Sequence, residues 1–182
     1  MRIYGNRELK TLPGRETRPT TARVREAVFN IWQHKIDNCR WLDICAGNGA
    51  MGAEALSRGA QLVVGIEQSG RACGVIKENW TKIAQTGQLF RIIKGDARSK
   101  LKTLTEEKFE LIYFDPPYES DLYQPVLNLV AKLDLLTLGG EIAVEHDTRR
   151  GDSLVVTGLK QIRSKNYGNT GLTFYTVPSN SS

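Results

Sequence analysis

Short apolar runs alternate with amphipathic stretches through most of the chain, in strand–helix–strand order. The runs that predict strands are Trp41–Cys45, Leu62–Ile66, Leu89–Ile93, Glu110–Phe114 and Glu141–Glu145. The stretches that predict helices are 50–58, 70–84 and 121–133, with a shorter one at 97–104. Such alternation is typical of a parallel sheet covered by helices on both faces and joined by right-handed crossovers. The pattern therefore predicts an α/β fold.

The C-terminal part of the chain departs from this alternation. Two β-rich runs, 153–157 and 172–177, are not separated by a convincing helix. Strands that follow each other without a crossover helix pair antiparallel. These runs therefore predict an antiparallel pair that closes one edge of the sheet.

The N-terminal part predicts two further elements. Residues 1–15 predict a short hairpin that turns at Gly5-Asn6. Residues 20–33 predict a helix, which Thr20 or Thr21 can cap. Apolar side chains recur along this helix at the spacing of one face. They are Val24, Ala27, Val28, Ile31 and Trp32.

The composition is that of an ordinary globular domain, with 182 residues, 40% hydrophobic and 25% charged. A chain of this length buries enough surface to fold as a single unit without disulfides or metals. Cys39, Cys45 and Cys73 show no CxxC or Cys/His spacing, which favours reduced thiols. No apolar run approaches the ~18 residues of a membrane span, and the N-terminus has no signal-peptide core. We therefore expect a soluble, cytoplasmic protein that holds no metal.

The formal net charge of +5 is concentrated at the start of the chain. Residues 1–40 contain nine Lys or Arg and four Asp or Glu, which accounts for the whole excess. A basic segment on a neutral body predicts a polyanionic partner, because cations set against phosphates release condensed counterions. A solvated basic face without a partner is the alternative interpretation.

A glycine-rich loop follows the first predicted core strand and opens the first core helix. Gly47, Gly49 and Gly52 fit the GxGxxG pattern, and Glu67 ends the next predicted strand. Glycines allow a tight turn and close approach of a ligand, and the carboxylate can accept hydrogen bonds from both ribose hydroxyls. The pattern therefore predicts a cofactor that carries a nucleoside.

Two acidic residues bear on which cofactor this is. Asp43 precedes the glycines, where a carboxylate would repel a pyrophosphate but would suit the ammonium of an amino-acid moiety. This favours S-adenosylmethionine over a dinucleotide. Asp96 ends the third predicted strand, and it can either bind the amino group of an adenine or cap the following helix.

An Asp-Pro-Pro-Tyr segment, Asp115 to Tyr118, ends the fourth predicted strand at the same edge of the sheet as the glycine loop. The exocyclic amine of a base is a poor nucleophile because its lone pair is delocalised into the ring. Hydrogen bonds to the Asp115 carboxylate and the Pro116 carbonyl would direct that lone pair at a methyl group and stabilise the developing positive charge. Tyr118 would stack on the base and hold it in line. The segment predicts transfer of a methyl group to an amine.

Together these motifs resemble the class I S-adenosylmethionine-dependent methyltransferases that methylate amines. Within that group the chain is similar to the RsmD family, bacterial enzymes that methylate the N2 amine of a guanine in 16S ribosomal RNA. Further matching segments are residues 18–30, 54–60 and 167–170. The chain departs from the family pattern at Ala22, where an acidic residue is expected, and at Gln68, where Asp is frequent.

The resemblance implies a Rossmann-like fold with a mostly parallel seven-stranded sheet, helices on both faces and an antiparallel edge. It implies an N-terminal basic extension, residues 1–35, that covers the pocket and meets RNA, followed by a methyltransferase domain, residues 36–182. It also implies that the chain acts on 16S rRNA within a small-subunit particle, and we expect a monomer.

The resemblance also implies roles for individual residues. The expected catalytic residues are Asp115, Pro116, Pro117 and Tyr118. The expected S-adenosylmethionine-binding residues are Asp43, Gly47, Gly49, Glu67, Gln68, Asp96, Ala97 and Asp115. The expected RNA-binding residues are Arg2, Arg7, Arg15, Arg18, Thr20, Arg23 and Arg25.

Three other functions compete with this interpretation. The same amine-binding turn would suit an N6-adenine methyltransferase acting on DNA or RNA. An NAD-dependent oxidoreductase would use the glycine loop but leave Asp115 to Tyr118 unexplained. A non-catalytic RNA-binding factor on the same fold would not need the complete set of site residues that this sequence carries.

Overall fold

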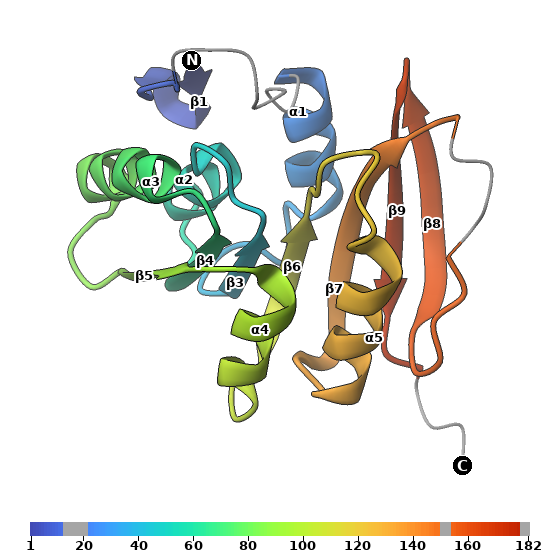
Figure 1. Cartoon of the computed structure of the whole chain (residues 1–182). Helices are drawn as coiled ribbons and strands as arrows, with labels where there is room; N and C mark the ends of the chain where they lie inside the picture. Colours follow the sequence, from blue (N-terminus) through green and yellow to red (C-terminus); the bar gives the residue numbers. More distant parts are fainter. Residues whose placement is uncertain (13–21, 150–153, 179–182) are drawn as a thin grey trace.

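The computed structural model describes residues 1–12, 22–149 and 154–178. Its centre is a seven-stranded sheet with the strand order β5-β4-β3-β6-β7-β9-β8 (Figure 1). The strands are β3 (Arg40–Ile44), β4 (Leu62–Glu67), β5 (Leu89–Lys94), β6 (Phe109–Phe114), β7 (Leu136–Asp147), β8 (Lys160–Tyr167) and β9 (Thr170–Thr176). Strands β3 to β7 are parallel, and β9 pairs antiparallel with both β7 and β8. The predicted α/β fold and antiparallel edge are confirmed.

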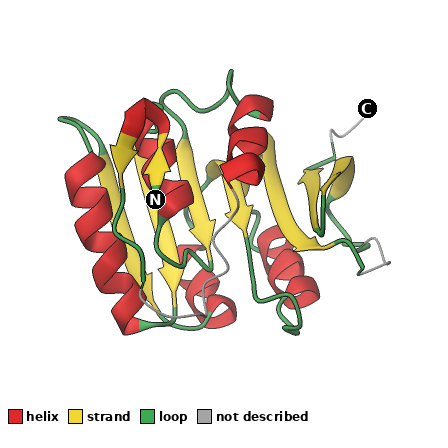
Figure 2. Ribbon diagram, turned by 90° about the horizontal axis from the view of Figure 1, so that it is seen from above, coloured by secondary structure: helices red, strands yellow, loops and turns green. Residues whose placement is uncertain are grey.

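Helices cover both faces of this sheet (Figure 2). On one face, α1 (Ala22–Ile31), α2 (Ala50–Ser57) and α3 (Gly70–Ile83) contribute to one apolar core. On the other face, α4 (Ala97–Leu101), the short 3-10 helix η2 (Lys102–Leu104) and α5 (Tyr123–Lys132) contribute to a second core. None of the described helices is both long and apolar enough to cross a membrane.

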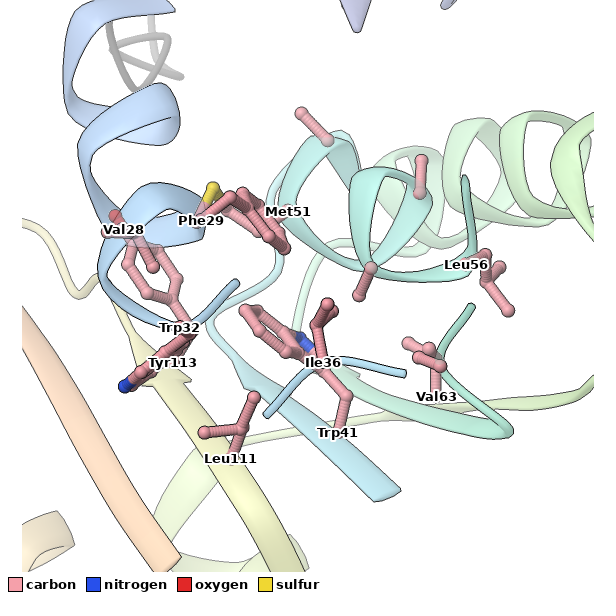
Figure 3. Close-up of a cluster of buried hydrophobic side chains, with 14 of the residues drawn as sticks. Val28, Phe29, Trp32, Ile36, Trp41, Met51, Leu56, Val63, Leu111 and Tyr113 are labelled. Carbon is pink, nitrogen blue, oxygen red and sulfur yellow. The ribbon is translucent and has the colours of Figure 1, made fainter. Parts of the chain in front are cut away.

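Aromatic side chains join α1 to the centre of the sheet (Figure 3). The ring of Phe29 stacks on that of Trp41 at a centroid distance of 5.3 Å, and Trp32 meets Trp41 edge-on at 5.5 Å. Val24, Val28 and Trp32 are fully buried, as the predicted apolar stripe requires. Helix α1 therefore shares a core with α2 and α3, while the division of the chain at residue 35 stays a prediction.

The N-terminal hairpin is shorter than expected within the described residues. Strand β1 (Arg2–Ile3) pairs antiparallel with β2 (Arg7–Glu8) around a one-turn 3-10 helix, η1 (Tyr4–Asn6). Gly5 and Asn6 have φ angles of 73° and 56°, in the left-handed region that glycine and asparagine tolerate best. The predicted turn is confirmed.

The prediction of a strand over 153–157 is wrong for the described residues of that range. Residues 154–157 form no strand, and the edge strand is β8, further along the chain. Val156 is instead buried in the second core, and the Leu154 carbonyl accepts a hydrogen bond from the Tyr175 hydroxyl at 3.1 Å. Leu154 and Val156 thus pack against the core from a loop, whereas Val155 is exposed. Strand β8 was missed because its side chains are almost all polar and exposed.

Trp80 of α3 packs directly beneath the glycine-rich loop. Its indole N–H donates a hydrogen bond to the Gly49 carbonyl at 2.8 Å. A Cβ atom on Gly52 would lie 2.3 Å from the Trp80 ring, and one on Gly65 would lie 2.6 Å from it. The third glycine of the GxGxxG pattern is therefore required for packing between α2 and α3, independently of any ligand.

We expect Gly52→Ala to lower the free energy of unfolding by about 1–3 kcal/mol, because the added methyl group would overpack the contact with Trp80 and Val63. The matched control is Gly74→Ala, an exposed position of α3 where a Cβ atom meets nothing within 4 Å. That change should raise the free energy of unfolding by about 0.4–1 kcal/mol. Urea denaturation of both variants tests this pair, and equal effects would contradict the assignment.

Candidate active site

Four acidic residues lie at the carboxyl ends of four neighbouring parallel strands. Asp43 lies in β3, Glu67 ends β4, Asp96 follows β5 and Asp115 follows β6. Backbone hydrogen bonds join the ends of these strands. They are Asp115 N to Ile44 O at 3.3 Å, Ala46 N to Ile66 O at 3.0 Å and Gly95 N to Glu67 O at 3.0 Å. The acidic residues are thereby fixed along one edge of the sheet, where ligand sites of open α/β sheets occur.

Cys45 lies among these four carboxylates. Burial raises the pKa of its thiol, and the negative charges of Glu67, Asp115, Asp43 and Asp96 raise it further, in that order. Its backbone φ of 64° is in the left-handed region that a residue other than glycine rarely adopts. The thiol is therefore a neutral group at the centre of a strongly negative region.

The Glu67 carboxylate holds the glycine-rich loop in position. One of its oxygens accepts a hydrogen bond from the Gly47 backbone at 2.9 Å, and the other accepts one from the Ser69 backbone at 2.8 Å. A carboxylate offers about four lone-pair sites, so both oxygens can still accept a further donor. Glu67 therefore fits the expected contact with two ribose hydroxyls.

The Asp43 carboxylate is almost completely buried behind the same loop. It is 2% exposed and accepts a hydrogen bond from the Gly52 backbone at 3.1 Å. Burial raises the pKa of Asp43 to about 7; the Gly52 N–H lowers it, and the nearby Glu67 adds to the increase. A cation that approached this carboxylate would offset the cost of its burial.

Asp96 caps helix α4. Its side chain accepts hydrogen bonds from the backbone N–H groups of Arg98 and Ser99 at 3.0 and 3.3 Å. A hydrogen bond from the Arg98 side chain holds the pKa of Asp96 below its usual value. The helix-cap interpretation is confirmed, and a contact with adenine stays a prediction, as do the roles of the exposed Gln68 and the buried Ala97.

The Asp-Pro-Pro-Tyr turn packs against strands β7 and β9 through its tyrosine. The Tyr118 hydroxyl donates to a carboxylate oxygen of Glu145 at 3.2 Å and lies 3.0 Å from the Thr170 hydroxyl. Asp115 and Tyr118 are partly buried, Pro116 is buried and Pro117 is exposed. The turn is thus fixed at both ends, by the Asp115 backbone at β3 and by the Tyr118 side chain at β7.

The sequence alone predicts no role for Glu145 in the site. It is 2% exposed, and its carboxylate also accepts a hydrogen bond from the Tyr113 hydroxyl at 2.5 Å. The Tyr123 hydroxyl donates to its backbone carbonyl at 3.3 Å. Three tyrosines thus surround one buried acid next to the predicted catalytic turn. The signal in the sequence was a single charged residue at the end of an apolar run in β7.

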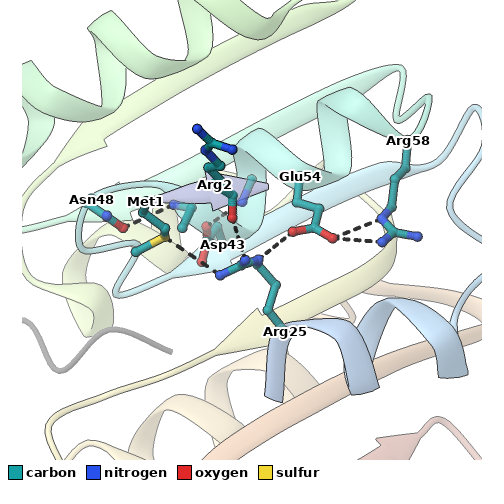
Figure 4. Close-up of polar contacts among 9 residues, drawn as sticks. Met1, Arg2, Arg25, Asp43, Asn48, Glu54 and Arg58 are labelled. Carbon is teal, nitrogen blue, oxygen red and sulfur yellow. Dashed lines mark hydrogen bonds and ion pairs between the residues drawn. The ribbon is translucent and has the colours of Figure 1, made fainter. Parts of the chain in front are cut away.

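The expected RNA-binding role of Arg25 is wrong, because its side chain is buried in the fold. Its Nε donates to Glu54 at 2.5 Å and its Nη2 donates to the Arg2 carbonyl at 2.8 Å (Figure 4). Glu54 is 2% exposed and also pairs with Arg58 at 2.8 Å. Arg25 therefore joins α1 to α2 and to the N-terminal hairpin.

The other expected RNA-binding residues differ in their surroundings. Arg2 donates to the Asn6 side chain at 3.1 Å, and Arg7 donates to the Ile83 carbonyl at 3.0 Å. Arg23 is exposed, and its guanidinium lies 5.8 Å from the centre of the Tyr167 ring. Arg15, Arg18 and Thr20 lie outside the described residues.

The charge of the site decides which expected cofactor fits it. The ammonium and sulfonium of S-adenosylmethionine are cations, and the four carboxylates around Cys45 would stabilise both. The same carboxylates would repel the pyrophosphate of a dinucleotide. In residues 1–12, 22–149 and 154–178, no group of three or more His, Cys, Asp or Glu is arranged to hold a metal ion.

Comparisons with known proteins agree with this geometry. The family model described as conserved hypothetical protein 95 matches residues 1–176. The Bacillus subtilis protein YlbH, provisionally named an rRNA methyltransferase, is 33% identical over 171 residues, covering 93% of this chain and 92% of the relative. The Escherichia coli ribosomal RNA small subunit methyltransferase D is 30% identical, with coverages of 87% and 78%.

The solved structure of the Escherichia coli protein yhhF has a TM-score of 0.85 and 29% sequence identity, and each chain covers 97% of the other. The family match spans every helix and strand described above, and the aligned regions cover 92% of YlbH and 78% of the Escherichia coli relative. The chain therefore belongs to the family described as conserved hypothetical protein 95, the RsmD-type methyltransferases.

Proposed function

We propose that this protein transfers the methyl group of S-adenosylmethionine to the exocyclic N2 amine of a guanine in small-subunit (16S) ribosomal RNA. One observation carries the proposal. The Asp115 backbone N–H donates to the Ile44 carbonyl at 3.3 Å, which ties the amine-binding turn directly to the strand that leads into the glycine loop. A donor held by that loop and an amine held by that turn would therefore meet at one edge of the sheet.

Three residues at the ends of β3 and β4 would hold the cofactor. Asp43 would accept the ammonium of its amino-acid part, and Glu67 would accept both ribose hydroxyls. Gly47, which donates its backbone N–H to Glu67, would let the ligand approach the loop closely. When bound, S-adenosylmethionine supplies a methyl carbon on a sulfonium, and the electron pair of the broken C–S bond stays on sulfur.

The turn would prepare the amine for attack. The Asp115 carboxylate and the Pro116 carbonyl would accept hydrogen bonds from the two N–H groups, which leaves the nitrogen lone pair directed at the methyl carbon. Positive charge that develops on nitrogen would be stabilised by the Asp115 carboxylate, and the methylated amine would then lose one proton through that carboxylate to solvent water. Tyr118 would stack on the base, and its hydroxyl contacts with Glu145 and Thr170 would restrict the ring to one orientation.

The choice of RNA rests on the relatives. The Escherichia coli protein and the Haemophilus influenzae protein, the latter 28% identical over 144 residues, are both named ribosomal RNA small subunit methyltransferase D. We carry their substrate over to this chain. The guanine N2 atom, the assembled particle as substrate, a monomeric enzyme and a cytoplasmic location are parts of the same proposal.

The raised pKa of Asp43 makes cofactor affinity depend on pH. The carboxyl of the free protein has a pKa of about 7, and contact with an ammonium favours its deprotonated form. Binding below pH 7 therefore releases one proton. We expect the affinity for S-adenosylmethionine to rise about tenfold per pH unit between pH 5 and 7 and then to level off.

Calorimetric titration across this pH range tests the linkage. Asp43→Asn, which cannot titrate, should bind more weakly at pH 7 and show a nearly flat pH dependence. A steep dependence that persists in this variant would assign the proton to another group.

We expect Asp115→Ala to reduce kcat for methyl transfer to small-subunit rRNA by about 10²–10³-fold, because it removes the acceptor that stabilises the developing charge. The matched control is Asp121→Ala in the following loop, where the side chain is 84% exposed and lies 3.6 Å from Arg98. Its activity should match that of the unmodified protein. Full activity in Asp115→Ala would remove the basis of the catalytic assignment.

The product nucleoside distinguishes the proposed substrate from its competitor. Incorporation of labelled methyl groups into rRNA, into assembled particles and into duplex DNA, followed by digestion and mass analysis, should give N2-methylguanosine from the ribosomal substrates. N6-methyladenine as the sole product, from DNA or RNA, would replace the proposal with the adenine methyltransferase.

A further inference from the structure

Strand β8 is an exposed edge strand that carries only positive charges. Residues 154–178 contain Lys160, Arg163 and Lys165 but no Asp or Glu. All three side chains are exposed, and within the described part of the chain none of them takes part in an ion pair. Figure 1 shows β8 as the outermost strand, next to β9. We refer to Lys160, Arg163 and Lys165 as the β8 basic strip.

An irregularity in strand pairing puts the β8 basic strip on a single face of the sheet. In a regular strand, Lys160 and Arg163 would point to opposite faces because side chains alternate. The register shifts between Gln161 and Arg163, so that Lys160 pairs with Thr176, Arg163 with Phe174 and Lys165 with Leu172. These three partners are alternate residues of β9, and paired residues share a face.

That face is the one covered by α1. The Phe174 ring of β9 contacts Trp32 edge-on at 5.6 Å, and the Arg163 guanidinium lies 5.8 Å from the centre of the Phe174 ring. At the far end of β8, the exposed Arg23 of α1 lies over the Tyr167 ring. The β8 basic strip and Arg23 thus form one basic surface, which runs about 23 Å along β8 at ~3.3 Å per residue.

This surface ends at the predicted catalytic turn. Tyr167 pairs with Thr170 across the tight turn between β8 and β9. The Thr170 hydroxyl lies 3.0 Å from that of Tyr118, the residue expected to stack on the target base. A strand of nucleic acid with one base at Tyr118 could therefore continue along the face of β8.

Ion pairs within the fold neutralise part of the positive charge of the N-terminal segment. Lys10, Lys35 and Arg40, from the basic N-terminal segment, pair with Glu78, Glu141 and Glu107 at 2.7, 2.6 and 3.2 Å. Arg25 pairs with Glu54. Four cations of the N-terminal segment are thus neutralised by carboxylates of the body, whereas the β8 basic strip has no ion-pair partner among the described residues.

We propose that the β8 basic strip, together with Arg23, binds the phosphate backbone of the substrate RNA next to the nucleotide that enters the site. This inference rests on the proposed function, because it takes RNA as the substrate. Cations within about 10 Å of phosphates act on them despite screening at 0.1 M salt, and each contact releases counterions.

A different explanation exists for basic residues at this position. Lysines on an edge strand hinder the pairing of exposed strands from two molecules, and this protects a protein from aggregation. That explanation predicts no effect of these residues on RNA binding. The two explanations therefore differ in a measurable quantity.

The test is a triple variant, Lys160→Gln, Arg163→Gln and Lys165→Gln, in the full chain. The probes are a 16S rRNA transcript and the assembled small-subunit particle, and dissociation constants are measured by filter binding from 50 to 300 mM salt. We expect affinity to fall about 10- to 100-fold at 0.1 M salt and the log–log salt slope to become less steep by about 2, because each phosphate contact contributes about −0.7.

The matched control removes three exposed lysines elsewhere, with Lys77→Gln on α3, Lys102→Gln on η2 and Lys132→Gln on α5. This control lowers the net charge by the same amount, and its RNA affinity should stay within about twofold of that of the unmodified protein. Unchanged affinity for S-adenosylmethionine in both variants serves as the check of folding.

The outcomes separate this inference from the proposed function. An unchanged RNA affinity in the β8 variant, or an equal loss in the control variant, would overturn the inference while methyl transfer to rRNA remained intact. If the unmodified protein bound rRNA through the β8 basic strip but transferred no methyl group, the proposed function would fail and the binding surface would stand. A β8 variant that only aggregates more, with unchanged affinity of its soluble fraction, would support protection of the edge strand instead.

Discussion

The placement of four carboxylates at one edge of the sheet is the constraint on which the site depends. The parallel register of β5, β4, β3 and β6 brings Asp96, Glu67, Asp43 and Asp115 to the same edge, and hydrogen bonds between strand ends prevent them from moving apart. Burial and repulsion by Glu67 leave Asp43 partly protonated near neutral pH, and Asp96 pairs with Arg98. A cationic ligand would reduce the remaining repulsion, so the sheet topology that gathers the carboxylates also favours a positively charged cofactor.

The supporting layer behind this edge leaves little freedom to the loops. Trp80 contacts the glycine loop from below, and Glu145 holds Tyr118 from the side of β7. Both contacts are made by buried groups whose hydrogen-bond partners belong to the predicted site. A shift of either buried side chain would therefore move the glycine loop or the turn to which the proposed chemistry is assigned.

The sequence predicted the fold best where the residue types are those expected for their place in the structure. The five parallel strands, the glycine loop and the Asp115 to Tyr118 turn were all recognisable, because buried strands are apolar and the turn residues have special backbone requirements. Strand β8 was not, since an exposed edge strand needs no apolar residues. Leu154 and Val156, which suggested a strand, instead pack against the core from a loop. Arg25 was misassigned because a helix turns 100° per residue: Arg23 faces solvent while Arg25 faces Glu54. Local charge counts do not contain that information.

The burial of Arg25 against Glu54 has a consequence for how this protein responds to its ionic surroundings. Ions in solution weaken attraction between exposed charges, but they hardly reach a pair whose side chains are 5% and 2% exposed. Helix α1 thus carries two arginines that respond differently to salt. The ion pair of the buried Arg25 is hardly affected by ionic strength, whereas the contacts of the exposed Arg23 are weakened by it. If RNA binds at Arg23 as proposed, added salt would release it while the attachment of α1 to the glycine-loop helix α2 persists.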